Sequence, residues 1–266
     1  YADGIPLSMN EGLKMVVDIL GYSGSMQTQD SSNTSLLITS GSTSILVDTS
    51  GSPAQALLQR NFNPDLLDAI VLTHAHVDHL YALPSLLHNL WMRKRQKELL
   101  IVGNPETLEA AKQLYQFFHL DRKPSLDSII CWADACKQVG DIELETFSLY
   151  HRPQMTTQGY TFFDGTGKVA YFPDSVVQKP YPDCAENSQL LIHEVGGLDV
   201  DRQALHRDGH SSAFEVAQLA KTLNAQALLL VHLPPSKAIH SAIFEEASGI
   251  FPAVRMPMEC SSFIVS

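Results

Sequence analysis

The chain has 266 residues, of which 44% are hydrophobic and 18% charged, a composition typical of globular proteins and not of disordered ones. Its 18 Lys and Arg residues against 29 Asp and Glu give a net charge of −11, so a protein that binds long nucleic acid is not expected. No apolar run reaches the roughly 18 residues that a membrane-spanning helix needs.

The first residues, YADGIPLSMN, do not show a basic segment followed by an apolar one, so no signal peptide is predicted. The four cysteines form no CxxC pair, which is typical of free thiols in a reducing compartment. We therefore expect a cytoplasmic protein. Residues 1–14 are interpreted as an N-terminal extension, and residues 15–266 as a single domain.

Strands and helices are expected to alternate in the first half of the chain. Predicted strands lie at 13–20, 35–39, 44–48, 69–74, 98–103 and 128–133, and predicted helices at 52–61, 84–97 and 105–120. The basic run RKRQK at 93–97 is interpreted as the solvated end of a helix.

The second half repeats this mixture. Predicted strands lie at 142–151, on both sides of an Asp164-Gly165 turn, at 189–195 and at 227–232, with helices at 212–224 and 236–247 and an extended tail. Loops are expected at 22–33, 152–158 and 197–209. Hairpins mixed with crossovers predict an α/β domain of two similar halves with mixed sheets.

The sequence VLTHAHVDHL, at 71–80, places His74, His76, Asp78 and His79 directly after a predicted buried strand. Imidazole and carboxylate groups are the ligands that zinc and similar metals prefer in catalytic sites. His74 and His76, two residues apart, can reach one ion, and Asp78 and His79 can reach a second ion beside it.

Two ions require further ligands, and three later positions suit this role. His151, Asp174 and His232 each follow an apolar strand, and α/β folds place functional residues at the carboxyl ends of strands. The three residues together indicate a metal site more strongly than any one of them does alone.

HxHxDH followed by His151, Asp174 and His232 resembles the metallo-β-lactamase superfamily over nearly the whole chain. The resemblance implies an αββα sandwich, two mixed β-sheets flanked by helices, with a metal site at the edge of the sheets. It assigns His74, His76 and His151 to a first metal, Asp78, His79 and His232 to a second, and Asp174 to both. It also gives Asp48 a supporting role beside the ligands.

LLIHEV and GHSSAFEVAQ are similar to the ribonuclease Z branch of this superfamily. That likeness implies that His210 acts on the scissile phosphate or the leaving group and that Glu194 orients it. Asp78 completes the expected catalytic residues. Only 22 residues separate His151 from Asp174, which leaves no room for the long tRNA-binding arm of ribonuclease Z.

The predicted function is that of a dinuclear metal-dependent hydrolase, a phosphodiesterase acting on a small or nucleotide-like diester. Alternatives are an arylsulfatase, a lactonase, a thioesterase, a β-lactamase, a tRNA 3′-processing endonuclease, or a metal-binding sensor without turnover. Two divalent ions are expected as cofactors, Zn²⁺ by default, with Mn²⁺ or Fe also compatible. The resemblance further implies a homodimer, to which the apolar stretch at 88–92 could contribute.

Overall fold

The computed structural model describes residues 14–153, 155–258 and 261–265. Nearly all of the expected N-terminal extension lies outside these residues, so a domain boundary at residue 15 stays a prediction. None of the helices in the described ranges is long and apolar enough to cross a membrane.

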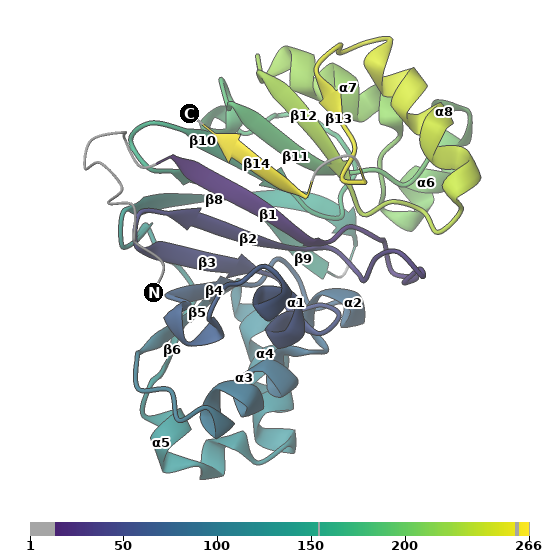
Figure 1. The fold of residues 1–266 in the computed structure, drawn as a ribbon. Helices are drawn as coiled ribbons and strands as arrows, with labels where there is room; N and C mark the ends of the chain where they lie inside the picture. The colour runs from purple at the N-terminus through teal and green to yellow at the C-terminus, as the bar shows by residue number, and fades with distance from the viewer. Residues whose placement is uncertain (1–13, 154, 259–260, 266) are drawn as a thin grey trace, which may run out of the picture.

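Two seven-stranded sheets form the centre of the molecule (Figure 1). The first sheet contains, in spatial order, β14 (Ser262–Val265), β1 (Met15–Gly21), β2 (Ser35–Ser40), β3 (Thr43–Val47), β4 (Ala69–Val71), β5 (Leu99–Val102) and β6 (Ile130–Ala133). The second contains β13 (Val254–Arg255), β12 (Ala227–Val231), β11 (Leu190–Glu194), β10 (Lys168–Phe172), β9 (Met155–Phe163), β8 (Ile142–Arg152) and β7 (Gln138–Val139).

Each sheet combines an antiparallel and a parallel part. Strands β1, β2 and β3 pair antiparallel, and β3 to β6 pair parallel. Strands β7 to β10 pair antiparallel, and β10 to β13 pair parallel. The two halves therefore share one plan, and both sheets are mixed as expected.

Helices cover the outer face of each sheet (Figure 1). The first sheet is covered by α1 (Pro53–Gln59), α2 (Val77–Leu80), α3 (Leu83–Met92), α4 (Pro105–Phe117) and α5 (Pro124–Asp127), and the second by α6 (Arg202–Asp208), α7 (Ala213–Thr222) and α8 (Lys237–Ser248). Short 3₁₀ turns lie at η1 (Pro64–Leu66), η2 (Leu120–Arg122), η3 (Asp183–Ala185) and η4 (Asp199–Asp201).

Alternation along the strands produces three hydrophobic layers. In β11, Leu190 and Ile192 face the layer between the two sheets, whereas Leu191 faces α7 and α8. In β4, Ala69 and Val71 face the same central layer, and Ile70 faces α3 and α4. Because successive side chains of a strand point to opposite faces, a strand buried on both sides must be apolar throughout.

The structure differs from the expected elements in several places. The run after β4 was expected as a loop, but residues 77–80 form α2, and α6 lies inside the expected loop 197–209. Strand β9 begins at Met155, so most of the expected loop 152–158 is strand. These segments are short or rich in polar residues, and tertiary contacts determine their conformation.

The basic run at 93–97 is only in part the solvated end of a helix. Helix α3 ends at Met92 with Arg93 as its C-cap residue, and four of the five residues of the run are exposed, but Arg95 is only 4% exposed. The Arg95 guanidinium donates to five carbonyl oxygens, those of Pro64, Asp65, Leu67, Lys97 and Glu98. A guanidinium offers enough donors to satisfy several carbonyls that would otherwise be buried without partners, which explains why this cation is inside the protein.

Candidate metal centre

The HxHxDH run lies where the first sheet meets the second. Strand β4 ends at Val71, His76 is the N-cap residue of α2, and Asp78 and His79 lie inside this helix. One turn of helix places Asp78 and His79 beyond the loop that carries His74 and His76. The four side chains therefore point into the gap between the two sheets from one short segment.

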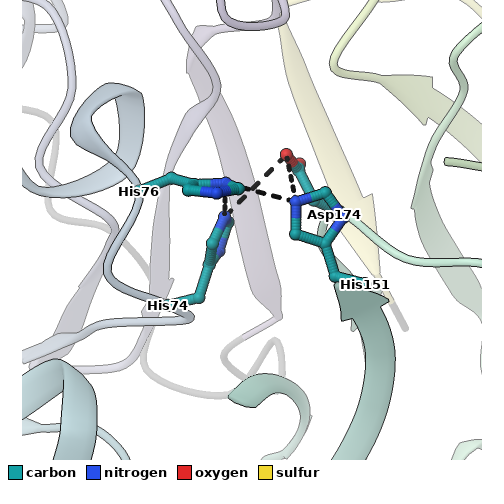
Figure 2. A group of neighbouring side chains, drawn as sticks. All are labelled: His74, His76, His151 and Asp174. Atoms are coloured by element: carbon teal, nitrogen blue, oxygen red, sulfur yellow. Dashed lines mark hydrogen bonds and ion pairs between the residues drawn. The ribbon is translucent and has the colours of Figure 1, made fainter. Parts of the chain in front are cut away.

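Three imidazole nitrogens converge on a first position (Figure 2). His76 Nδ1 lies 3.0 Å from His74 Nε2 and 3.2 Å from His151 Nε2. Ligands about 2.0–2.1 Å from a tetrahedral Zn²⁺ would be roughly 3.3 Å apart, so this spacing fits a single ion. His151, from the end of β8, completes a group that the first sheet alone does not supply.

A second group lies beside the first and is richer in carboxylates. His79 Nε2 lies 3.6 Å from Asp78 Oδ2, and His232 Nε2 lies 3.5 Å from the same oxygen. His232 directly follows β12, so it also comes from the second sheet. Donor atoms of Asp78, His79, Asp174 and His232 all lie within 4.8 Å of one another.

Asp174 divides its two oxygens between these groups. Its Oδ2 lies 3.9 Å from His74 Nε2 and 4.0 Å from His151 Nε2. Its Oδ1 lies 3.5 Å from His79 Nε2 and 3.3 Å from His232 Nε2. The arrangement is what the resemblance implied for a carboxylate shared between two cations.

Asp48 orients two of the histidines from behind. Its Oδ2 accepts from His79 Nδ1 at 2.8 Å and from the Thr73 hydroxyl at 2.9 Å. The Thr73 hydroxyl has one proton and gives it to Asp48, so His74 Nδ1, 3.0 Å away, donates to Thr73 Oγ1. In both histidines the Nε2 lone pair is thereby directed at the metal positions, as expected for outer partners of metal ligands.

Gly209 has the same effect on His151 through its backbone. The Gly209 carbonyl accepts from His151 Nδ1 at 2.7 Å. Its φ is +84°, and a Cβ added there would lie 2.2 Å from the His151 carbonyl oxygen and 2.5 Å from His151 Nδ1. Only glycine fits this position, because it accepts the left-handed conformation and allows the close approach.

The charges of the cluster favour cation binding. Burial lowers the pKa of His74, His76 and His151, so these imidazoles are kept neutral with free lone pairs. Burial would raise the pKa of Asp174, but the histidines around it outweigh this and hold it well below its ordinary range. Among the described residues, His79 Nε2 and Asp174 Oδ1 are buried atoms without a hydrogen-bond partner, as expected of donors awaiting a metal.

His210 and Glu194 lie next to the second group. His210 Nδ1 is 3.3 Å from Glu194 Oε2, and the backbone N–H of Ser211 donates to Glu194 Oε1 at 2.7 Å. Glu194 is fully buried at the end of β11, whereas the His210 side chain remains 20% exposed. Its ring stacks on His232 with the centroids 5.4 Å apart, which holds it against the metal cluster.

The structure thus brings together all seven expected ligands, the supporting Asp48, and the pair formed by His210 and Glu194. Their roles stay predictions, since what is observed is their convergence. Sequence reasoning missed Thr73 and Gly209. Gly209 stands directly before His210, and that adjacency was the signal available; the Thr73 hydroxyl acts through a contact that only the fold creates.

Comparison with known proteins agrees with the architecture. Residues 43–233 match the family model described as the beta-lactamase superfamily domain. "Probable metallo-hydrolase YhfI" of Bacillus subtilis (strain 168) is 27% identical over 241 residues, covering 89% of this chain and 94% of the relative. "Ribonuclease Z" of Bradyrhizobium sp. (strain ORS 278) is 25% identical over 288 residues, covering 89% and 95%.

Solved structures give the same result. The crystal structure of Bacillus subtilis YhfI has a TM-score of 0.79 at 26% identity and covers 94% of this chain and 98% of that one. A diphosphatase from the PhnP family has a TM-score of 0.71 at 17% identity, over 91% and 94%, and at that identity it supports the fold alone. The expected αββα sandwich is confirmed. The chain therefore belongs to the beta-lactamase superfamily and is a hydrolase of that family, with His and Asp side chains positioned to hold a metal.

Proposed function

We propose that this hydrolase is a dinuclear metal-dependent phosphodiesterase that acts on a small or nucleotide-like diester. The observation that carries the proposal is the pair of ligand groups sharing Asp174, with the His210 and Glu194 pair beside them. His74, His76 and His151 would hold one ion, and Asp78, His79 and His232 the other. Zn²⁺ fits these donors best, and Mn²⁺ or Fe is also compatible.

Two divalent ions bound there would activate a water molecule and neutralise charge on the attacked phosphate. The protein itself would supply the proton transfers. The Asp78 carboxylate would accept a proton from the attacking water. His210, held at Nδ1 by Glu194, would donate its other ring proton to the leaving alkoxide, which is a poor leaving group until it is protonated.

The surroundings of the site favour a small substrate. Strands β8 and β9 are joined through residues 153–154 alone, and β9 and β10 occupy the chain between His151 and Asp174. No length remains there for an arm that could hold transfer RNA, and the net charge of −11 does not attract a polyanion. The relative named ribonuclease Z supports phosphoester chemistry for this chain.

The test pairs elemental analysis with hydrolysis of small phosphodiesters that have alkoxide leaving groups, among them a cyclic nucleotide, by the wild type and by His210→Ala. His206→Ala is the matched control, because His206 lies on α6, bonds to Glu215 and belongs to neither ligand group. We expect two metal ions per chain in all three proteins and a loss of turnover of roughly 100-fold or more in His210→Ala only.

Either of two outcomes would overturn the proposal. Full metal content without phosphodiester turnover would move the assignment to a sulfate ester, lactone or thioester, each of which is assayed on the same preparation. Unchanged turnover in His210→Ala would remove the role given to His210.

A further inference from the structure

An apolar cavity of about 550 Å³ is lined by residues from α2 and α4 and from the chain next to these helices. Part of its wall comes from the metal-binding segment and part from the last turns of α4. Its main lining residues are Ala75, Val77, Tyr81, Leu114, Phe117 and Phe118.

The cavity and the metal centre share one loop. Ala75 and Val77 alternate with His74, His76 and Asp78 along the chain, so the ligands face the metal positions while the intervening side chains face the cavity. The ligands and the cavity wall are therefore adjacent along this segment, and a substrate arm that passes over the exposed Val77 would reach the cavity.

The lining is unusually apolar for a surface feature. Val77 and Phe117 are each 75% exposed and Phe118 is 55% exposed, and no charged residue lines the cavity. Large exposed apolar side chains that cluster, rather than occurring singly, mark binding surfaces. The two phenylalanine rings meet edge to face with centroids 5.1 Å apart, which gives the wall an aromatic rim.

The polar groups of the cavity already have partners. The Tyr81 hydroxyl accepts from the Gly51 N–H and from Gln27 Nε2, both at 2.7 Å. Gln113 Nε2 donates to Glu109 Oε1 at 3.0 Å. The Tyr81 hydroxyl can still donate its own proton and the Gln113 amide oxygen can still accept, but seven of the nine lining residues are apolar, so an occupant would gain most of its binding from apolar burial.

We propose that this cavity binds a hydrophobic alkyl or aryl ester group of the substrate while the phosphate lies at the metal centre. The inference rests on the proposed phosphodiesterase function and narrows it to diesters with an uncharged hydrophobic arm. Charge complementarity supports this proposal. The anionic phosphate would lie among the polar ligands, and the neutral ester group would lie in the uncharged cavity lined by residues of the same loop.

The test measures kcat/KM for a series of p-nitrophenyl alkyl phosphates with methyl, butyl and octyl groups, so that every substrate releases the same phenol. In the wild type we expect kcat/KM to rise about twofold to fourfold per added methylene until the cavity is filled. Phe117→Ala should flatten this rise. Phe163→Ala is the matched control, an exposed phenylalanine on β9 outside the cavity.

Four outcomes are distinguishable. No turnover of any ester by the metal-loaded wild type would overturn the proposed function itself. Turnover that is flat across the series would overturn this inference alone, as would a rise that Phe117→Ala leaves intact. A wild-type dimer that becomes monomeric in Phe117→Ala, observed by analytical ultracentrifugation, would assign the surface to a second copy of the chain and also overturn it.

Discussion

The two sheets contribute to the candidate metal centre in different ways. The first sheet supplies four ligands within the single segment 74–79, and Asp48, which directly follows strand β3, orients two of them. The second sheet supplies His151, Asp174 and His232 from three strand ends, and distant residues hold them in place. His151 bonds to Gly209, and the His232 N–H donates to the Thr34 hydroxyl. One contribution is local in the chain, and the other exists only once the chain has folded.

This difference predicts how each contribution fails. A substitution that disturbs the first sheet's contribution should change the orientation of only one or two ligands. A substitution that disturbs the second sheet's contribution should affect more of the site, because each of its ligands depends on a loop from elsewhere in the fold.

The largest effect on activity is expected for substitution of His210, which lies beside the ligands of the second sheet. Burial opposes protonation, but the Glu194 carboxylate outweighs it and raises the pKa of His210 to about 9. A raised pKa means that the imidazolium is present below about pH 9 and is lost above it. Wild-type kcat/KM should therefore fall as pH rises through about 9, and His210→Gln should lower activity about 10²- to 10⁴-fold and abolish this limb. A limb that persists in the variant would assign the titration to another group.

The next largest effect is expected for Gly209→Ala. The new Cβ would overlap with His151, so the loop or the imidazole must shift. A displacement of about 1 Å at a reacting site costs roughly 100-fold in rate. Metal analysis should show loss at the first position and, because Asp174 belongs to both ligand groups, weaker binding at the second.

Gly165→Ala provides the control for backbone strain. Gly165 also has a positive φ, of +87°, but a Cβ there meets nothing within 4 Å. The Gly165→Ala variant should lose some stability and retain its metal and activity. Equal metal loss in both variants would show that strain, and not contact with His151, is responsible.

Asp48→Asn tests the local contribution. Asp48 Oδ2 accepts from His79 and the Thr73 hydroxyl, and Oδ1 accepts from the Thr73 N–H. An amide has only one acceptor oxygen and no charge, so at least one of these bonds is lost and the tautomer of His79 is held less firmly. Loss of such an outer partner weakens metal affinity about 10- to 100-fold. Competition with a chelator, followed for both ions, should show weaker binding at the second position and smaller weakening at the first. Loss of both ions at once would mean that the local contribution is as interdependent as the distributed one.

The smallest effect is expected at Asp164, which joins the two sheets far from the ligands. Its carboxylate accepts from the Ser40 hydroxyl at 2.7 Å and from the N–H groups of Thr166 and Gly167. Burial opposes ionisation, but these bonds lower the pKa of Asp164. The stabilisation is present above the unfolded pKa of about 4 and is lost as pH falls below it.

Asp164→Ala should therefore lower the free energy of unfolding by about 1 kcal/mol near neutral pH, measured by urea denaturation. Asp164→Asn keeps an acceptor and should lose less. Activity should be unchanged in both variants, and a change in metal content in either would contradict the separation between this junction and the site.

The part of the site that could be predicted directly from the sequence is the part whose ligands lie close together in the chain. HxHxDH stands in one segment, so ligand chemistry and spacing are visible before the fold is known. His151, Asp174 and His232 are single residues at strand ends, and family resemblance joined them to the motif. Helix α2 and the burial of Arg95 could not be predicted, because four residues carry no periodicity and the carbonyls around Arg95 come together only in the folded chain.

The strand ends beside the metal positions also bear on evolution towards greater stability. Asp48 and His232 each adopt a left-handed backbone conformation, with φ of +55° and +54°. For a residue other than glycine this conformation costs about 1–2 kcal/mol. Selection for thermal tolerance alone would favour glycine or asparagine at these two places and would remove the side chains that hold the site. Function and rigidity therefore make opposite demands on the same two residues.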